Sequence, residues 1–179
     1  MPLIVVGGSG RGVGKTSLVC GLIAALSEFR WTAFKISSHS HDNAEPIREE
    51  RTPGHSADTQ RYLAAGAHRA LLVEARDDTF AEAVRALWEQ VDASAPLIFE
   101  SNRIVDYCRP DVCLAVTGSD ESASKPSFAR LAERADALVL RSNVESVQWH
   151  ARPVYFLAET ERVSPELLVW VRGRLAGKS

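Results

Sequence analysis

The sequence is poor in cysteine, with only Cys20, Cys108 and Cys113 among its 179 residues. An odd and sparse set of thiols argues against a disulfide framework and favours a reducing compartment. Cys20 falls in a helical pattern and is expected in the core. Cys108 and Cys113 are separated by four residues, a looser spacing than that of common zinc-ligand pairs, and no second pair exists. Metal binding at these two thiols is therefore only a minor alternative.

The chain also lacks a large excess of charge and long apolar runs. It has 21 basic and 23 acidic side chains and a formal net charge of −2, which excludes the electrostatic footprint typical of nucleic-acid binding. No apolar stretch approaches the ~20 residues that span a bilayer, and the first apolar run, Leu3–Val6, is too short for a signal peptide. We therefore expect a single cytoplasmic domain over residues 1–179, with neither nucleic acid nor membrane as a partner.

What the sequence does have is a glycine-rich segment directly after the apolar run Leu3–Val6. The segment is Ser9-Gly10-Arg11-Gly12-Val13-Gly14-Lys15-Thr16, and an amphipathic helical pattern follows it. This is the strand, loop and helix context of a Walker A phosphate-binding loop, although Ser9 stands where the first glycine is usual. The alternative is a glycine-rich turn with an accidental Lys-Thr. The residues predicted to contact a nucleotide are Gly10, Arg11, Gly12, Val13, Gly14, Lys15, Thr16 and Ser17.

The side chains of this loop have distinct predicted roles. Lys15 is expected to neutralise phosphate charge and to stabilise the charge that develops during phosphoryl transfer, which is a catalytic role. Thr16 is expected to bind Mg²⁺ directly, and Ser17 to donate to the phosphates. The alternative for both hydroxyls is that they only cap the helix.

Strand and helix patterns alternate along the chain. The predicted strands are Leu3–Val6, Trp31–Ile36, Arg69–Ala75, Pro96–Phe99, Asp111–Val116, Ala137–Leu140 and Val154–Leu157. The predicted helices run from the glycine-rich loop to about Arg30, over Ala57–Ala65 after a Ser56 cap, from a Thr79 capping box through Val91, over about Ser127–Ala135, and over about Pro165–Leu175 after a Ser164 cap. This alternation predicts an α/β, three-layer P-loop NTPase fold with a mostly parallel sheet of about seven strands. Ligands of such sheets bind at the carboxyl ends of the strands.

The segment from Ser37 to His55 has no periodicity and is predicted to be a long loop, which in a compact domain is often functional. His39 and His41 would lie on one side of an extended chain there. Together with Asp42 they could grip a metal or an anionic substrate, and solvated loop histidines are the alternative.

Several charged residues are candidates for chemistry near the carboxyl ends of the strands. Glu100 ends an apolar strand, where a carboxylate can hold Mg²⁺ through water or orient an attacking water, and a surface charge is the alternative. Asp42 and Asp58 are competing carboxylates for the same metal. Lys35, Asp58 and Arg61 are candidates for contacting a second, phosphorylated substrate. An ordinary surface pair between Asp58 and Arg61, one helical turn apart, is the alternative.

Selection of a base should come from loops after the later strands, but the sequence contains no Asn-Lys-x-Asp guanine motif. Asn143, after the strand Ala137–Leu140, is the best candidate. Lys125 could stack on a base, and a solvated residue at a helix start is the alternative.

The segment after the second predicted strand resembles the MobB family, molybdopterin-guanine dinucleotide biosynthesis protein B. The corresponding residues are Lys35, His39, His41-Asp42, Pro53-Gly54, Asp58-Thr59, Arg61 and Ala65-Gly66-Ala67. The resemblance covers about the first hundred residues and ends at the strand that carries Glu100. Where that family has Glu-Gly, this sequence has Glu100-Ser101.

The resemblance implies binding of GTP with Mg²⁺, slow GTP hydrolysis, and an adaptor role in attaching a nucleotide to the molybdenum cofactor. It also implies a cofactor-nucleotide transferase as a partner and a homodimer. Two alternatives remain open from the residues alone. One is an ATP-dependent small-molecule kinase or ligase, and the other is a non-catalytic adaptor whose docking is controlled by nucleotide.

Overall fold

The structure, a computed structural model, describes residues 1–38, 46–52, 57–92, 94–118, 126–141, 152–157 and 162–177. Its strands are β1 (Leu3–Gly8), β2 (Thr32–Ser37), β3 (Ile47–Glu50), β4 (Arg69–Glu74), β5 (Leu97–Glu100), β6 (Val112–Thr117), β7 (Ala137–Arg141) and β8 (Val154–Leu157). Its helices are α1 (Lys15–Ala25), α2 (Asp58–Ala64), α3 (Phe80–Glu89), α4 (Pro126–Arg134) and α5 (Pro165–Ala176), together with the 3₁₀ helix η1 (Ile104–Asp106).

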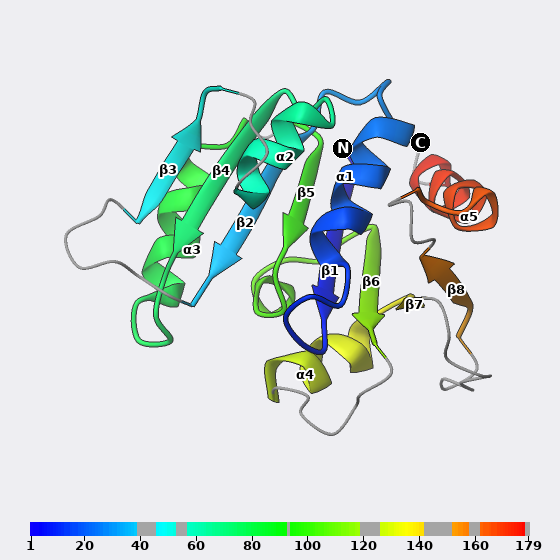
Figure 1. The fold of residues 1–179 in the computed structure, drawn as a ribbon. Helices are drawn as coiled ribbons and strands as arrows, with labels where there is room; N and C mark the ends of the chain where they lie inside the picture. Colours follow the sequence, from blue (N-terminus) through cyan, green and yellow to red (C-terminus); the bar gives the residue numbers. More distant parts are fainter. Residues whose placement is uncertain are drawn as a thin grey trace.

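The strands form one sheet in the order β3-β4-β2-β5-β1-β6-β7-β8 (Figure 1). Every neighbouring pair is parallel except β3 with β4. Parallel neighbours need crossover connections, and the helices between the strands supply them. The prediction of a mostly parallel α/β sheet is confirmed.

In the described part of the chain the sheet has eight strands rather than about seven, because the predicted long loop after β2 contains β3. Ile47 is the buried residue of β3, while its neighbours are charged and partly exposed. Two ion pairs fasten this edge strand to β4, Arg48 to Glu74 at 3.1 Å and Glu49 to Arg69 at 2.8 Å. A strand with one apolar residue among charges has no alternating pattern, which is typical of a protected sheet edge.

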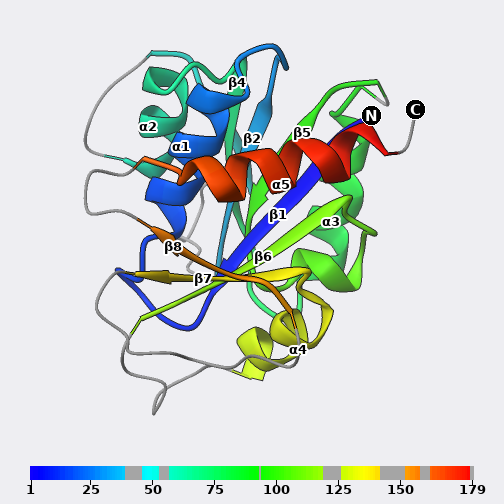
Figure 2. The ribbon, with the colours of Figure 1, turned by 90° about the vertical axis from the view of Figure 1, so that its right-hand side faces the viewer.

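Helices cover both faces of the sheet, giving three layers (Figure 2). Helices α1, α2 and α5 pack on one face, and α3 and α4 on the other. Helix α1 shows why the chain folds this way, because Leu18, Val19, Leu22 and Ile23 recur at helical spacing and are buried against the sheet. No helix in the described ranges is long and apolar enough to cross a membrane.

Helix α1 is shorter than predicted, since it ends at Ala25 rather than near Arg30. The next residue, Leu26, is fully buried although it lies outside the helix. Its carbonyl accepts a hydrogen bond of 3.0 Å from the indole N–H of Trp31. Because Leu26 is buried after the helix has ended, the apolar spacing in the sequence continues past the last helical turn, and the predicted helix was too long.

The predicted helix caps have different outcomes. Ser164 caps α5 as predicted, because its hydroxyl accepts a 3.2 Å hydrogen bond from the Leu167 N–H. Thr79 precedes α3 but makes no capping bond, so the predicted capping box is wrong. Its hydroxyl points back to the Arg76 carbonyl at 3.5 Å. Ser56 lies outside the described residues, and Ala57 holds the N-cap position of α2.

Candidate functional site

The glycine-rich loop joins the carboxyl end of β1 to the first turn of α1 (Figure 1). Gly12 and Gly14 have φ angles of +73° and +105°, which residues with a Cβ adopt rarely. Gly14 is the N-cap of α1, and its carbonyl accepts the first helical hydrogen bond, from Leu18, at 2.9 Å. The two glycines therefore provide the sharp turn that the sequence predicted for a phosphate loop.

Lys15 folds back along this loop, and its ammonium group donates a hydrogen bond to the Gly10 carbonyl. The close passage of the Lys15 side chain also explains why residue 8 is a glycine. A Cβ at Gly8 would lie 2.8 Å from both Cγ and Cδ of Lys15. The local sequence thus leaves room for the lysine beside the end of β1 and aims its charge into the loop.

Ser9, where the motif usually has glycine, is buried and fastens the loop to β6. Its N–H donates to the Val116 carbonyl at 3.0 Å, and its hydroxyl accepts a 3.0 Å hydrogen bond from Thr117. The departure from the usual motif therefore adds polar contacts at the base of the loop without blocking it.

Asn102 also anchors the loop, and sequence reasoning did not single it out. Its side-chain oxygen accepts the Gly8 N–H at 2.7 Å, and its side-chain NH₂ donates to the Gly8 carbonyl at 3.0 Å. Both polar groups of one backbone residue are thereby paired with a single side chain. Asn102 joins the segment after β5 to the end of β1 just before the phosphate loop.

Glu100 lies at the end of β5 and receives contacts from three different elements. The Thr16 hydroxyl of α1 donates to its Oε2 at 2.8 Å. The Tyr62 hydroxyl of α2 donates to the same oxygen, and the Lys35 ammonium of β2 pairs with Oε1. The glutamate is only 2% exposed, so the alternative that it is a surface charge is excluded.

Lys35 bridges two carboxylates, Glu100 and Asp58, and its Nζ lies 2.9 Å from the Asp58 Oδ2. Burial alone would lower the pKa of Lys35, but the two carboxylates outweigh it and raise that pKa. Burial alone would raise the pKa of Asp58, but the hydrogen bond from Lys35 holds that pKa below its ordinary value. Both groups are therefore charged near neutral pH.

Tyr62 belongs to this network, and sequence reasoning did not single it out. Its side chain is fully buried, and burial, followed by the Glu100 charge, raises the pKa of its hydroxyl well above the ordinary value. The hydroxyl thus stays a proton donor to Glu100. The sequence places Tyr62 next to Arg61 in a predicted helix, but its contact with Glu100 depends on how that helix packs on the sheet.

The oxygen atoms of this cluster suit a hard divalent cation such as Mg²⁺. Thr16 offers a hydroxyl, and Glu100 and Asp58 offer carboxylates. Mg²⁺ in nucleotide sites usually takes one or two protein oxygens and completes its shell with phosphates and water. Within the described ranges, no group of three or more His, Cys, Asp or Glu side chains could hold a metal alone. Thr16 and the two carboxylates could supply the one or two protein oxygens of such a site.

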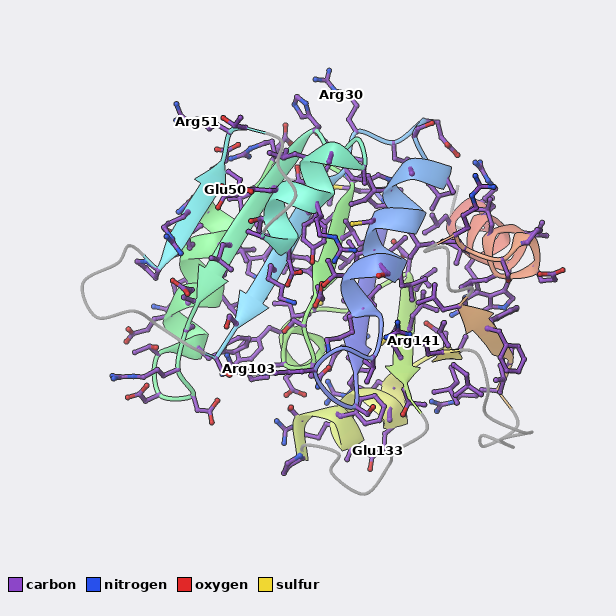
Figure 3. The ribbon with its side chains drawn as sticks, viewed as in Figure 1. Arg30, Glu50, Arg51, Arg103, Glu133 and Arg141 are labelled. Carbon is purple, nitrogen blue, oxygen red and sulfur yellow. The ribbon has the colours of Figure 1, made fainter. Side chains whose placement is uncertain are left out.

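Arg61 contacts the first turn of α1, and Arg141 contacts the loop before it. The Arg61 guanidinium lies 3.4 Å from the Ser17 hydroxyl and 3.9 Å from Asp58, so the helix pair that the sequence offered as the alternative to substrate binding is present. Arg141 of β7, which the sequence did not indicate, donates to the Gly12 carbonyl at 2.8 Å. Figure 3 shows Arg141 at the loop end of the sheet, with Arg30 at the other end.

A cavity of about 540 Å³ opens beside the loop. Its lining residues are Gly8, Gly10, Arg11, Lys15, Lys35, Ile36, Ser37, Ser38, Asp77, Glu100, Ser101, Asn102, Arg103, Pro126, Ser127 and Arg130. Of the predicted substrate residues that the structure describes, only Lys35 is in this lining. Asp58 and Arg61 lie on α2 and do not line the cavity. Val13, a predicted nucleotide contact, packs against the core on the α2 side of the sheet. His39, His41, Lys125 and Asn143 are outside the described residues.

Solved structures share this architecture. LpxK from Aquifex aeolicus in complex with ATP has a TM-score of 0.56 and 20% identity, over 87% of this chain and 53% of that one. This chain therefore spans about half the length of LpxK. A MobB homologue from Bacillus stearothermophilus has a TM-score of 0.50 and 20% identity over 97% of this chain and 99% of its own.

Bacillus subtilis MobB has a TM-score of 0.51 and 16% identity, over 97% of this chain and 98% of its own. The chain has the P-loop NTPase fold. Its likeness to MobB is thus confirmed at the level of fold. The sequence itself matches no protein-family model and no curated protein.

Proposed function

We propose that this protein binds a nucleoside triphosphate with Mg²⁺ through the loop before α1 and hydrolyses its terminal phosphoanhydride slowly. The observation that carries this proposal is the 2.8 Å hydrogen bond between Thr16 and Glu100. It joins the residue after the loop lysine to a buried carboxylate at the end of a neighbouring strand. A loop that was glycine-rich by accident would need no such partner on the neighbouring strand.

Each residue then has a chemical role. Lys15 contacts the terminal phosphates and stabilises the charge that develops as the phosphoanhydride breaks. Thr16 binds the Mg²⁺ that comes with the phosphates. Glu100 accepts a hydrogen bond from a water, either in the Mg²⁺ shell or aligned for attack on the phosphorus. Lys35 and Tyr62 hold the Glu100 carboxylate in position.

For the nucleotide and pathway we propose GTP and molybdenum cofactor biosynthesis, with a cofactor-nucleotide transferase as partner and a homodimeric assembly. Support comes from the MobB-like fold over 97% of the chain and from the sequence pattern Lys35 to Ala67. In this role the protein would need to hold the nucleotide rather than to hydrolyse it rapidly, which is why slow turnover is proposed.

A second candidate function is ATP-dependent phosphoryl transfer to a small molecule. One observation favours it: the cavity continues beyond the loop, past Glu100 to Arg103 and Arg130. LpxK, which shares the fold, was solved with ATP. Pure hydrolysis needs space for a water, whereas a cavity of this extent has space for a second substrate.

The experiment that tests the proposal is a competition of GTP against ATP for a fluorescent nucleotide analogue, with Mg²⁺ and with EDTA. The proposal predicts a preference for GTP and weaker binding in EDTA. A strong preference for ATP would instead support the kinase candidate. In the Thr16→Val variant, the effect of EDTA should shrink, while the conservative Thr16→Ser variant should retain it. Nucleotide-dependent capture of a partner that persists in Glu100→Gln would favour a non-catalytic adaptor.

A further inference from the structure

The cavity beside the loop has a wall that the proposed nucleotide chemistry does not use. Gly8, Gly10 and Lys15 form one side, where the terminal phosphate would lie. Arg103, from the segment after β5, and Arg130, from α4, belong to the remainder. Among the residues that the structure describes, five cationic side chains and two acidic ones line this cavity. With a magnesium-bound triphosphate in place, these side chains would leave an excess of positive charge in the space next to it.

Arg103 is held in place before any ligand arrives. Its NH2 nitrogen donates to the Ala75 carbonyl at 2.7 Å, and its guanidinium carbon lies 3.9 Å above the Phe80 ring. Its backbone N–H donates to the Ser101 hydroxyl at 3.1 Å. These contacts join the residue before η1 to the residue after β4 and to α3. A guanidinium fixed this way loses little conformational freedom when it binds an oxyanion.

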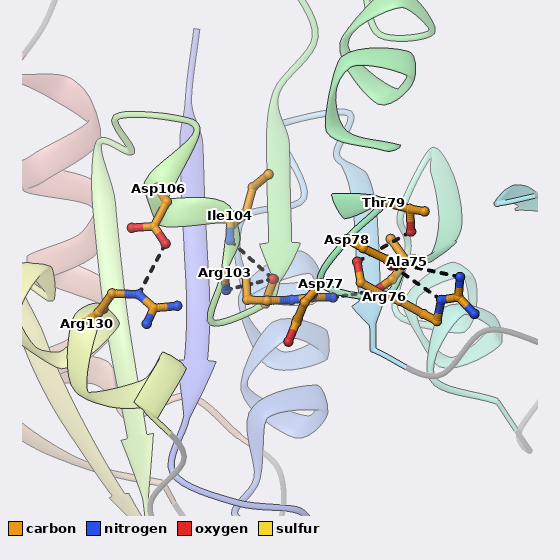
Figure 4. Close-up of polar contacts among 10 residues, drawn as sticks. Ala75, Arg76, Asp77, Asp78, Thr79, Arg103, Ile104, Asp106 and Arg130 are labelled. Atoms are coloured by element: carbon orange, nitrogen blue, oxygen red, sulfur yellow. Dashed lines mark hydrogen bonds and ion pairs between the residues drawn. The ribbon is translucent and has the colours of Figure 1, made fainter. Parts of the chain in front are cut away.

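The carboxylates that meet the two arginines are replaceable partners. Arg103 pairs with Asp77 at 2.6 Å, and the Asp77 side chain is 94% exposed. Arg130 lies 3.4 Å from Asp106, which also pairs with Arg134 at 2.9 Å, and the Arg130 side chain is 52% exposed (Figure 4). In each pair one side chain is more than half exposed, and such pairs contribute little to stability, so a better-placed anion displaces the carboxylate at small cost. Asp77 occupies the donor that such an anion would take.

We propose that Arg103 and Arg130 form a subsite for the phosphate group of a second, small-molecule substrate, bound next to the terminal phosphate of the nucleotide. This inference rests on the proposed nucleotide site. Arginine suits the role because its planar fork gives two parallel hydrogen bonds to a phosphate. The subsite lies across the sheet from Arg61, so the second substrate binds on the α3 and α4 side rather than beside α2.

The test uses two successive calorimetric titrations of the full chain. The first adds a non-hydrolysable Mg²⁺-GTP analogue, and separately the matching ATP analogue, and measures nucleotide binding alone. The second titrates the saturated protein with inorganic phosphate, and separately with ribose 5-phosphate and ribose. We expect the saturated wild type to bind phosphate and ribose 5-phosphate but not ribose.

Variants then locate the subsite. Arg130→Gln, on the exposed face of α4, should weaken phosphate binding at least fivefold, and Arg103→Gln at least tenfold, with melting curves recorded for both. Asp77→Asn should strengthen phosphate binding, because it removes the competing carboxylate. The matched control Asp78→Asn alters an exposed pair with Arg76 and should leave phosphate affinity unchanged. None of these variants should change the first titration by more than about twofold.

The outcomes separate the two proposals. If neither nucleotide analogue binds in the first titration, the nucleotide proposal fails. If a nucleotide analogue binds but phosphate does not bind the saturated protein, the subsite proposal alone is overturned. Equal phosphate affinity in wild type, Arg130→Gln and Asp77→Asn would also overturn it, even if Arg103→Gln does not fold.

Discussion

The Thr16 hydroxyl donates a hydrogen bond to the Glu100 carboxylate, and the two oxygens are 2.8 Å apart. Thr16 lies in the first turn of α1, and Glu100 is the last residue of β5. The contact thereby couples the phosphate loop to a buried carboxylate that Lys35 and Tyr62 also contact.

Removing the charge of Glu100 should slow hydrolysis. In Glu100→Gln we expect phosphate release to fall roughly 100-fold, because an amide cannot accept a proton from water as a carboxylate does. Single-turnover phosphate release measures this directly. Glu28→Gln is the matched control, since Glu28 pairs with Arg172 on the surface, and its rate should equal that of the wild type. An unaltered rate in Glu100→Gln would contradict the role given to this residue.

Removing the Tyr62 hydroxyl should destabilise the fold. Tyr62→Phe leaves the buried Glu100 carboxylate without one donor, and we expect the free energy of unfolding to fall by about 1–3 kcal/mol. Urea denaturation measures the change. Tyr107→Phe serves for comparison, because Tyr107 is 45% exposed, and its effect should stay within about 0.5 kcal/mol. Equal stability of both variants would mean that the Tyr62 contact contributes nothing.

Asp58 should contribute a pH-dependent part of the stability. Its pKa in the folded protein lies below the ordinary value of 3.8, so the unfolded chain takes up the proton first as the pH falls. The stabilisation is complete above pH 3.8 and is lost as the pH falls through the folded-state pKa.

The free energy of unfolding of wild type and Asp58→Asn, measured by urea denaturation between pH 7 and pH 2.5, should therefore differ most above about pH 4 and converge in acid. Asp78→Asn, which alters an exposed ion pair, should show no such convergence. A constant gap between wild type and Asp58→Asn over the whole range would contradict the assignment.

Cys108 and Cys113 should be slow to alkylate in the folded protein. Burial raises the pKa of Cys108 to about 11 and that of Cys113 to about 12. At pH 8 only about one Cys108 thiol in a thousand is then a thiolate, the form that reacts. Iodoacetamide pulses read by mass spectrometry should label both residues at least tenfold faster in urea than in the native state. Rapid native labelling of Cys108 would show that its thiol is not held in this environment.

Local patterns in the sequence were sufficient to predict the main architecture and the phosphate loop. Apolar strands alternating with amphipathic helices dictate a parallel sheet between two helical layers, and Gly12, Gly14, Lys15 and Thr16 are adjacent in the chain. Strand β3 could not be found in this way, because only Ile47 of its residues is buried. Its stability comes from ion pairs to β4, which no periodicity encodes.

The rest of the site depends on contacts between distant segments. Asn102 meets Gly8 across a separation of 94 residues, and Tyr62 meets Glu100 across 38. Arg103 reaches Ala75 across 28 residues. Such pairs are set by how helices pack on the sheet, so one sequence indicates the residue types but not their partners. Arg61 shows the reverse case, because its local spacing from Asp58 was enough to indicate, as an alternative, the pair that the structure contains.

The central claim is that the loop before α1 binds a nucleoside triphosphate, and calorimetric titration of Mg²⁺-GTP and Mg²⁺-ATP into wild type and Lys15→Ala tests it most directly. Arg76→Ala, which removes an exposed cation paired with Asp78, is the control for loss of positive charge. We expect wild type and Arg76→Ala to bind at least one of the nucleotides, and Lys15→Ala to lose at least 100-fold in affinity. Wild-type affinity in Lys15→Ala, or no binding by the wild type, would contradict the account.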